Sequence, residues 1–532
     1  MSLEEQEPLL SRSVSPTDSN KTLLSGDESN TTVGEGTTRS IEDDVLPETP
    51  TVGRTITWPS AYILVISRVI GSGIFATPGV IVKGVGSVGL SLLLWVIGAI
   101  IAACGLAVGL EYGCMLPRSG GEKVYLEFTY RKPRFLASTM VATQAVLLGF
   151  TASNCIVFAQ YTLYAFDIEA TDFLRKSLAV GLLTAITIVH GCFRTTGIRI
   201  QNFLGWIKVA LVVFMIFAGL FAVAFRSQGE DGGKSHFPTR SDLWKDTDWS
   251  WGIISSSLFK VFYSFAGLNN VNNVLNEVRN PVRTLKSVSI TALVTACIVY
   301  LLINVAYFTV VPLEEVKNSG ELIAALFFER CFGPRVGKTF LPLAVALSGA
   351  GNVMARLNQE VARQGFLPFS KLLASSRPFN APLGGLIVHY IPSLLVIALP
   401  PSSEVYSFIL EVEGYPGQVF ALATSAGLLW LRYKRPDLKR PFKAWSVAVI
   451  LRVILSLALL AAPFFPPKDG QKKGGIWYAT YAFVGISVII FGLLYWYVWI
   501  RLIPGWKGYR LEEETSILDD GTTVSTLVHV TT

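Results

Sequence analysis

Apolar segments of about 20 residues recur along almost the whole chain, and they constrain the fold more than any other feature. A helix of that length crosses the hydrocarbon core of a bilayer with every backbone hydrogen bond satisfied inside the segment. Charged residues make up only 16% of the 532 residues, against about 25% in an ordinary soluble domain. The sequence therefore predicts an all-α polytopic membrane protein.

We place twelve transmembrane helices in a membrane domain over residues 56–505. A disordered tail over 1–55 precedes this domain, and a second polar tail over 506–532 follows it. The predicted spans are 61–82, 88–116, 135–165, 174–193, 201–226, 252–276, 287–311, 337–357, 383–400, 404–431, 445–465 and 476–500.

The distribution of Lys and Arg in the loops predicts the orientation of the chain. The loops on the side of the N-terminus carry 23 of these residues, and the loops on the other side carry 14. Because positively charged loops stay in the cytosol, both termini are expected there. The net charge of +7 sits in these short loops, so it does not indicate nucleic-acid binding.

The first span contains residues that a lipid-facing helix disfavours. Residues 67–79 read SRVIGSGIFATPG, in which Gly71 and Gly73 are poor helix formers and Pro78 lacks a backbone donor. A helix broken at bilayer depth is tolerated only where protein or a polar cavity covers the unpaired backbone groups, and it points to a transport site. The alternative is a glycine-packed helix with a proline kink.

The sixth span repeats this anomaly, because residues 262–277 hold five asparagines and Gly267. Spans one and six are five spans apart. This spacing matches a five-plus-five inverted repeat, each half beginning with a discontinuous helix, followed by two further spans.

Motifs spread over residues 58–505 resemble those of the amino acid–polyamine–organocation superfamily, and within it the L-amino acid transporter branch. The residues that carry the resemblance are Ile70-Gly71-Ser72-Gly73-Ile74-Phe75, Pro117-Arg118-Ser119-Gly120-Gly121-Glu122, Ile200-Gln201-Asn202 followed by Lys208, Asn276-Glu277-Val278-Arg279-Asn280-Pro281, Asn304-Val305-Ala306-Tyr307-Phe308, and Ala362-Arg363-Gln364-Gly365-Phe366-Leu367-Pro368. Residues 67–71 and 352–363 are most similar to the fungal high-affinity methionine permeases.

The resemblance implies a secondary active transporter, not an enzyme, in the fungal plasma membrane. It implies import of a neutral L-amino acid, methionine in the first place, by proton symport and alternating access. One alternative is an exchanger or symporter for another neutral amino acid. Another is an amino acid sensor on the same fold that does not transport.

Both broken helices offer backbone groups to an α-amino acid. Amides at the start of a half-helix hold a carboxylate, and carbonyls exposed at helix ends accept bonds from an ammonium group. The predicted amide donors are those of Gly71, Ser72, Gly73 and Ile74. The predicted carbonyl acceptors are those of Val69, Ile70, Tyr263, Ser264 and Ala266.

The resemblance implies that Tyr263 gates the site. The family often has a bulky tryptophan five residues further on, where this chain has Leu268. A less aromatic wall suits the flexible side chain of methionine. The alternative role for Tyr263 is core packing.

Several charged residues lie in or near the spans. For Lys208, in the middle of the fifth span, the resemblance implies an ammonium group that replaces a sodium ion and bridges carbonyls of spans one and eight. Its deprotonation would loosen the bridge and so couple transport to protons; the alternative is a permanently charged strut. We predict that Glu111 and Glu277 close an inner gate with loop arginines such as Arg118 or Arg279, or else lie as interfacial charges near water.

The other cations near span ends are expected to lie at the membrane surface. Lys260 and Arg452 are placed there, and Arg68 either joins the inner-gate network or reaches the inner surface.

No cofactor or metal is expected, because the four histidines show no ligand spacing. The animal heterodimeric members of the branch carry a cysteine in the loop after the third span. Residues 166–172 have none here, so no disulfide-linked heavy chain is expected. The resemblance also implies ubiquitin-ligase regulation through the N-terminal tail, at Lys21, and the alternative is an unmodified tail.

Overall fold

In a computed structural model of the chain, the structure describes residues 54–149, 151–225, 238–351, 383–400, 405–465, 472–473, 476–517 and 523–531. The predicted disordered tail lies outside these residues except for its last two positions. Lys21 and the motif at 362–368 also lie outside them.

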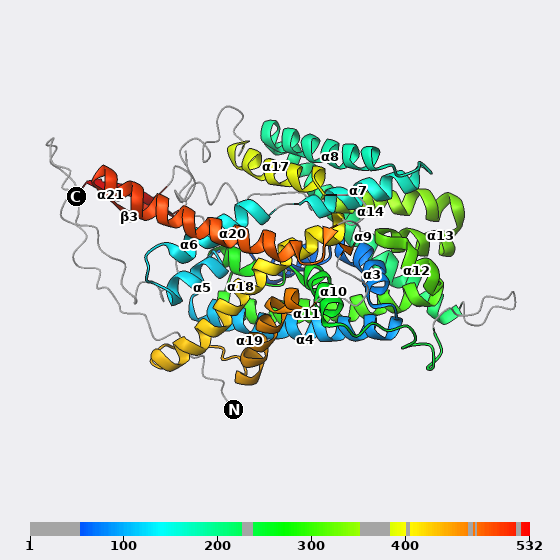
Figure 1. The fold of residues 1–532 in the computed structure, drawn as a ribbon, viewed down its shortest axis with the longest axis horizontal. Helices are drawn as coiled ribbons and strands as arrows, with labels where there is room; N and C mark the ends of the chain where they lie inside the picture. The colour runs from blue at the N-terminus through cyan, green and yellow to red at the C-terminus, as the bar shows by residue number, and fades with distance from the viewer. Residues whose placement is uncertain are drawn as a thin grey trace. The chain divides into compact units, whose positions relative to one another are not determined.

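The described residues are predominantly helical (Figure 1). The first half contains α2 (Trp58–Val69), α3 (Gly73–Val85), α4 (Val88–Met115), α5 (Glu122–Thr129), α6 (Leu136–Leu148), α7 (Ala152–Ala165), α8 (Asp172–Cys192), α9 (Arg194–Phe225), α10 (Trp251–Phe265) and the 3₁₀ segment η2 (Asn270–Glu277). The second half contains α11 (Pro281–Val310), α12 (Leu313–Ser319), η3 (Gly320–Leu322), α13 (Ile323–Arg335), η4 (Val336–Phe340), α14 (Leu341–Ala350), α17 (Leu383–Ala398), α18 (Val405–Lys434), α19 (Ser446–Leu460), η5 (Ala462–Phe464), α20 (Thr480–Trp496), η6 (Tyr497–Leu502) and α21 (Ile503–Lys507).

Within the described ranges, eight helical stretches are long and apolar enough to cross a membrane, by length and composition. They are Trp58–Val85, Val88–Met115, Leu136–Ala165, Asp172–Cys192, Phe203–Phe221, Pro281–Val310, Ser446–Phe464 and Thr480–Lys507. A polytopic helical protein is thereby confirmed. The count of twelve spans and the inverted repeat stay predictions.

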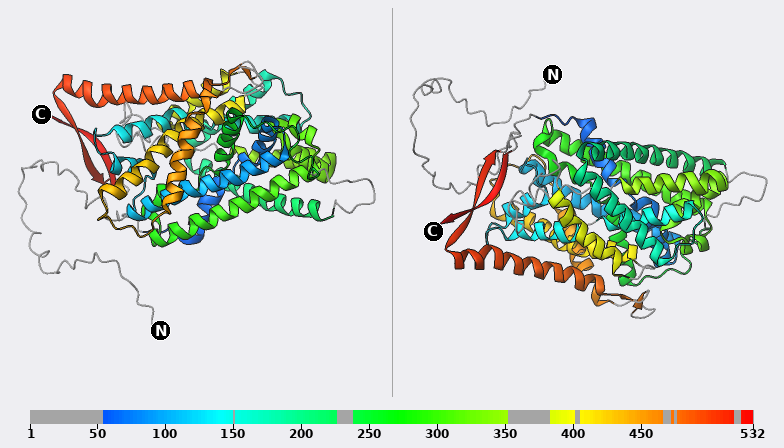
Figure 2. Two further views of the ribbon diagram at one scale, coloured as in Figure 1. Left: turned by 60° about the horizontal axis from the view of Figure 1, so that its bottom comes forward. Right: turned by 90° about the horizontal axis from the view of Figure 1, so that it is seen from above.

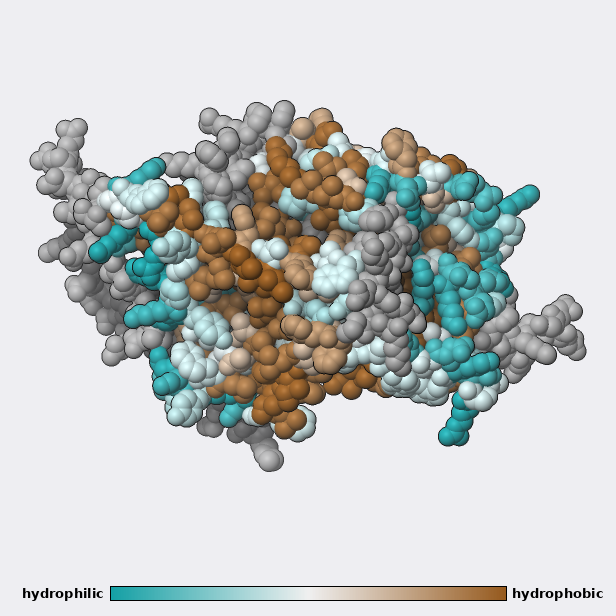
Figure 3. All heavy atoms as spheres, viewed as in Figure 1, coloured by the Kyte–Doolittle hydropathy of each residue, from teal (hydrophilic) through white to brown (hydrophobic). Residues whose placement is uncertain are grey.

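Apolar side chains cover much of the face shown in Figure 3, with hydrophilic residues toward two opposite edges of the view. Large side chains such as Ile454 of α19 and Phe483 of α20 are more than half exposed. Exposed apolar surface of this extent is what a lipid-facing protein presents.

Both predicted helix breaks are present. In the first span α2 ends at Val69, Ile70 is extended, and α3 begins at Gly73. In the sixth span α10 ends at Phe265, and Gly267 adopts φ +106°, a left-handed conformation that favours glycine. The two breaks touch, because a Cβ on Gly267 would lie only 2.8 Å from Cγ of Arg68.

Helices around the breaks hold them together. α3 packs against α10 (Figure 1), and α2 packs against α11 and η2. Behind the sixth-span break, the rings of Phe265, Trp95 and Tyr300 form an edge-to-face cluster, with centroids 5.1 Å apart for Phe265–Tyr300 and 5.5 Å for Trp95–Tyr300. This buried cluster fixes the end of α10.

The structure departs from an all-α protein in two short antiparallel pairs. β1 (Lys472–Lys473) pairs with β2 (Ile476–Trp477), and β3 (Tyr509–Ile517) pairs with β4 (Thr523–Thr531). The second pair, seen as two red strands in Figure 2, lies in the segment predicted as a polar tail. Its Val, Thr and Ile residues favour strands, a preference that the sequence analysis passed over.

Candidate functional site

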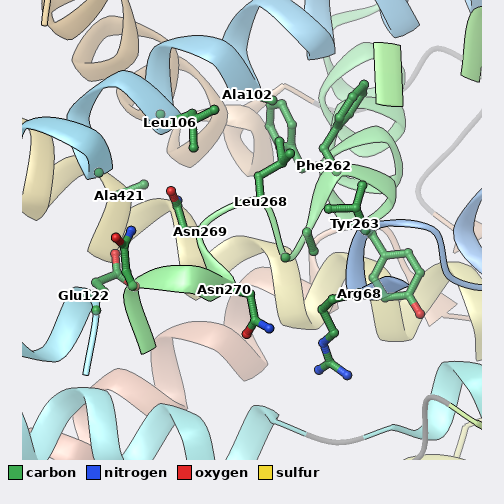
Figure 4. A pocket seen from close by; sticks show the side chains of 18 of the residues that line it. Arg68, Ala102, Leu106, Glu122, Phe262, Tyr263, Leu268, Asn269, Asn270 and Ala421 are labelled. Carbon is green, nitrogen blue, oxygen red and sulfur yellow. The ribbon is translucent and has the colours of Figure 1, made fainter. Parts of the chain in front are cut away.

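The two breaks face one cavity of about 560 Å³ (Figure 4). Six of the predicted site residues line it: Val69, Gly71, Gly73, Tyr263, Ala266 and Leu268. Four other predicted residues do not line it: Ile70, Ser72, Ile74 and Ser264. The remaining wall comes from α4, α5, α7, η2, α18 and α19.

The start of α3 presents free backbone donors. The amides of Phe75 and Ala76 both donate to the Ser72 carbonyl, at 3.2 and 3.1 Å. Among the described residues, no backbone bond engages the amides of the range 71–74, the unpaired donors that every helix start leaves. Because Gly71 and Gly73 lack a Cβ, a carboxylate in the cavity can approach these amides.

Side chains around the first break form a hydrogen-bonded network. The Ser72 hydroxyl donates to Oδ1 of Asn154 at 2.8 Å and lies 3.2 Å from the Tyr263 hydroxyl. The Tyr263 hydroxyl is also 2.9 Å from Oγ of Ser153. Tyr263 therefore links the sixth span to the first and third while its ring lines the cavity, and its gating role stays a prediction.

Several predicted carbonyl acceptors are already engaged. The Tyr300 hydroxyl donates to the carbonyls of Val69 and Ser264, at 2.8 and 2.7 Å. The Tyr263 carbonyl accepts the Ala266 amide at 3.1 Å. In the described part of the chain, the Ile70 and Ala266 carbonyls accept no hydrogen bond, so they are the better candidates for a bound ammonium group.

Sequence reasoning missed Tyr300. It lies one turn before the Asn304 motif of the seventh span, and its hydroxyl joins both breaks. Nothing in the sequence distinguishes it from the other tyrosines of apolar segments.

Lys208 is buried and its ammonium group donates to the Ser67 carbonyl at 2.7 Å. Ser67 lies in the last turn of α2, where the break leaves carbonyls without a helical partner. The contact supports the span-one half of the predicted bridge, and the span-eight half stays a prediction. Lys208 itself does not line the cavity.

Glu111 pairs with arginines of a predicted loop, but not with Arg118 or Arg279, so the two arginines named for it are wrong. Its side chain is fully buried and forms a bidentate pair with Arg432, with Nε to Oε1 at 3.0 Å. Arg440 approaches Oε1 at 3.4 Å, and the Ala444 amide donates to Oε2 at 2.7 Å. The pair ties α4 to the end of α18, so Glu111 is not an interfacial charge near water either.

Glu277 is exposed at the end of η2. Its carbonyl accepts the Ile56 amide at 2.8 Å, and Ile56 and Val278 form a parallel bridge. The segment before the first span is thus joined to the segment after the sixth. A gate role for Glu111 or Glu277 stays a prediction.

Two cations predicted at the membrane surface lie inside the protein. Lys260 is 3% exposed and forms an ion pair with Oε1 of Glu411 at 2.9 Å. Arg452 lines the cavity and donates to Oε1 of Gln418 at 3.1 Å. The prediction was wrong because it used distance from the span end and ignored which face of the helix each residue occupies.

Three more charged residues line the cavity: Arg68, Glu122 and Glu413. In Figure 4, Arg68 lies below Tyr263 at one end of the view, and Glu122 lies at the other end. Sequence reasoning missed Glu413, although an acidic residue inside a predicted span is itself a signal of function. Within the described ranges, no group of three His, Cys, Asp or Glu residues is placed to hold a metal ion.

The family model of the amino acid permeases matches residues 56–491 of this chain. The chain belongs to this family. It is 36% identical to the high-affinity methionine permease of Saccharomyces cerevisiae over 86% of this chain and 81% of the relative. It is 33% identical to the low-affinity methionine permease of the same yeast, over 89% and 87%.

A human relative, b(0,+)-type amino acid transporter 1, is 28% identical over 86% of this chain and 88% of its own. The resemblance read from the motifs is confirmed. This amino acid permease is a multi-pass membrane protein of a transporter family and not an enzyme.

Proposed function

We propose that this permease imports methionine, a neutral L-amino acid, across the fungal plasma membrane by proton symport, with both termini in the cytosol. The observation that carries the proposal is the cavity at the two breaks. It brings the unpaired amides at the start of α3 together with the Ala266 carbonyl and the apolar side chain of Leu268. The yeast methionine permeases among its relatives support the choice of substrate.

The substrate would lie with its carboxylate on the amides of residues 71–74. A half-helix start stabilises an anion through free N–H donors and through the positive end of the helix dipole. The ammonium group would bind the free Ile70 and Ala266 carbonyls, and the thioether chain would pack toward Leu268. This arrangement needs no acidic side chain at the ammonium group.

The position of the cavity supports alternating access. Its wall includes Gly121 and Glu122, which lie in a loop predicted in the cytosol, and of the residues of α3 it includes only Gly73. With the N-terminus in the cytosol, the structure would represent an inward-facing state. Closing this side and opening the outer one would move α3 relative to α10.

Lys208 is proposed to couple this motion to protons. Its ammonium group donates to the Ser67 carbonyl, so it holds the end of α2 next to the break. Loss of its proton weakens that bond and frees the half-helix.

Uptake of labelled methionine into yeast that lacks its own methionine permeases tests the function. We expect uptake to rise as the external medium is acidified. Excess unlabelled methionine should suppress this uptake more than other neutral amino acids do. Stronger competition by another amino acid would reassign the substrate. Uptake only into cells preloaded with an amino acid would indicate an exchanger. Binding of methionine without any uptake would indicate a sensor.

A further inference from the structure

We propose that Glu413 of α18 is a second proton-coupling residue, which binds the transported proton inside the substrate cavity. The inference rests on the proposed proton symport and adds a group that the Lys208 mechanism does not use. In this proposal the Glu413 carboxylate, which is accessible from the substrate cavity, takes up one proton on one face of the membrane. It releases that proton on the other face.

The first observation is the state of the Glu413 side chain. Glu413 lines the cavity, and its Oε2 atom is buried without a hydrogen-bond partner in the described part of the chain. A buried carboxylate that lacks a partner is costly when ionised, and a proton on Oε2 removes this cost. A cation that enters the cavity would remove it as well.

The second observation is the contrast with Glu411 on the same helix. Glu411 pairs with Lys260 and accepts the Ser256 hydroxyl, so it has fixed partners outside the cavity. Two residues along a helix are about 200° apart, so the two carboxylates face opposite ways. One of them is used for packing, and the cavity-facing one is left available.

The third observation is the position of Arg68. Arg68 lines the same cavity and attracts the Glu413 carboxylate, yet no ion pair within 4.0 Å joins the two residues. Arg68 also repels the Lys208 ammonium group, which is bonded to the carbonyl of the neighbouring Ser67. A proton on Glu413 removes the negative charge that balances Arg68, and Lys208 keeps its own proton on the Ser67 carbonyl in this step.

The other charged groups packed against α18 have partners of their own. Lys260 of α10 pairs with Glu411, Arg452 of α19 bonds Gln418, Glu111 of α4 pairs with Arg432, Glu122 of α5 accepts the Thr424 hydroxyl, Tyr263 of α10 bonds Ser72 and Ser153, and Tyr481 of α20 packs on Tyr415. Two tyrosines, Tyr406 of α18 and Tyr125 of α5, have buried hydroxyls without a hydrogen-bond partner among the described residues. A phenol hydroxyl carries its proton at neutral pH, so neither tyrosine competes with a carboxylate for a proton there.

The cycle balances one proton per substrate. In the outward-facing state, an external proton binds Oε2 and gives a neutral carboxylic acid, and the zwitterionic amino acid enters. After the cavity opens to the cytosol, the amino acid leaves and Oε2 releases its proton there. The empty carrier returns with Glu413 ionised and Arg68 as its counter-charge. Each cycle therefore moves one positive charge inward.

The test uses the full chain, purified and reconstituted in liposomes, with labelled methionine. A gradient of one pH unit, acid outside, should let the wild type accumulate methionine up to about tenfold, because one proton moves per substrate. Glu413→Gln should not accumulate methionine above the external concentration, while retaining measurable methionine–methionine exchange at equal pH. Glu413→Asp should restore accumulation in part. Glu411→Gln, the matched control two residues away, should reach the wild-type ratio per reconstituted molecule.

Methionine binding to the purified proteins in detergent is measured as well, because it does not depend on how well a variant inserts into the liposomes. Wild-type affinity should fall as the pH is raised, whereas Glu413→Gln should bind with an affinity that the same pH change leaves within about twofold. Gradient-driven accumulation by Glu413→Gln, or wild-type pH dependence of its binding, would overturn the inference. Wild-type exchange without accumulation would refute proton symport and this inference together. Accumulation only of another amino acid would refute the substrate alone, and the Glu413 comparison would then be made with that amino acid.

Discussion

Replacing Gly73 by alanine tests whether the contact of the two broken helices is needed for transport. A Cβ at this position would lie 2.7 Å from Oγ and 3.0 Å from Cα of Ser264, on the facing helix α10. Ordinary contacts begin near 3.4 Å, so α3 and α10 must separate by several tenths of an ångström at the site. The same methyl group would reach toward the amides proposed to hold the substrate carboxylate.

The cost follows from the packing. An extra methyl group in a closely packed interface typically costs about 1–3 kcal/mol. If the bound state carries this cost, methionine binding weakens by a factor between about five and a hundred and fifty. The Ser264 contact includes the backbone Cα as well as the hydroxyl, so a side-chain rotation of Ser264 cannot relieve it fully.

Gly84 is a matched control, because it lies on the same helix and faces the same neighbour. A Cβ on Gly84 would have its nearest atom, Oγ of Ser257, at 3.7 Å, which is an ordinary contact. Methionine uptake kinetics, corrected for the amount of protein at the membrane, should show a raised KM for Gly73→Ala and near wild-type values for Gly84→Ala. Equal kinetics for the two variants would refute the argument from close approach.

Three further predictions concern the residues that hold the site. Tyr300→Phe removes the hydroxyl whose one proton is shared between carbonyls at the two breaks, an interaction worth about 0.5–1.5 kcal/mol, and should lower the apparent Tm in detergent and weaken methionine binding; unchanged values of both would contradict the bridging role. Glu111→Gln leaves buried arginines without their carboxylate and should cost about 3–5 kcal/mol, seen as a marked fall in apparent Tm, whereas Glu277→Gln on an exposed residue should not; an equal effect of both would refute the buried-pair argument. Lys208→Met should weaken the pH dependence of uptake and leave the part that Glu413 contributes, and a variant with the full wild-type pH dependence would remove Lys208 from proton coupling.

The breaks in the first and sixth spans could be predicted because they depend on backbone chemistry. Glycine disfavours the interior of a helix whatever its neighbours are, so the sequence alone shows that a continuous helix is disfavoured at Gly71, Gly73 and Gly267. The structure places the interruptions at these residues. Their partnership was also readable, since the two interruptions lie five spans apart, each at the start of one predicted half.

The partners of individual side chains could not be predicted, because they depend on which helices become neighbours. Glu111 and Arg432 are 321 positions apart in the chain. The Tyr300 hydroxyl contacts the Val69 carbonyl at the first-span break and the Ser264 carbonyl at the sixth-span break. Sequence reasoning named Arg118 and Arg279 as partners of Glu111, whereas the packing of α4 on α18 and α19 supplied Arg432. Loop helices such as α5 were likewise invisible to an analysis guided by apolar length.

The charged residues inside the spans fall into two groups: those that stabilise helix packing and those that face the substrate cavity. Distance from a span end placed Lys260 at the surface, but its helical face turns it toward Glu411, and the pair stabilises the contact of α10 with α18. Arg68 and Glu413 differ from that pair because each faces the cavity and they do not neutralise each other at close range. Arg68 is exposed, whereas Oε2 of Glu413 is buried, and a buried charge without a fixed partner is tolerated only if something mobile can compensate for it. In a permease cavity the mobile species are the substrate and the proton, so the unpaired charges, more than the paired ones, mark the residues on which transport should depend.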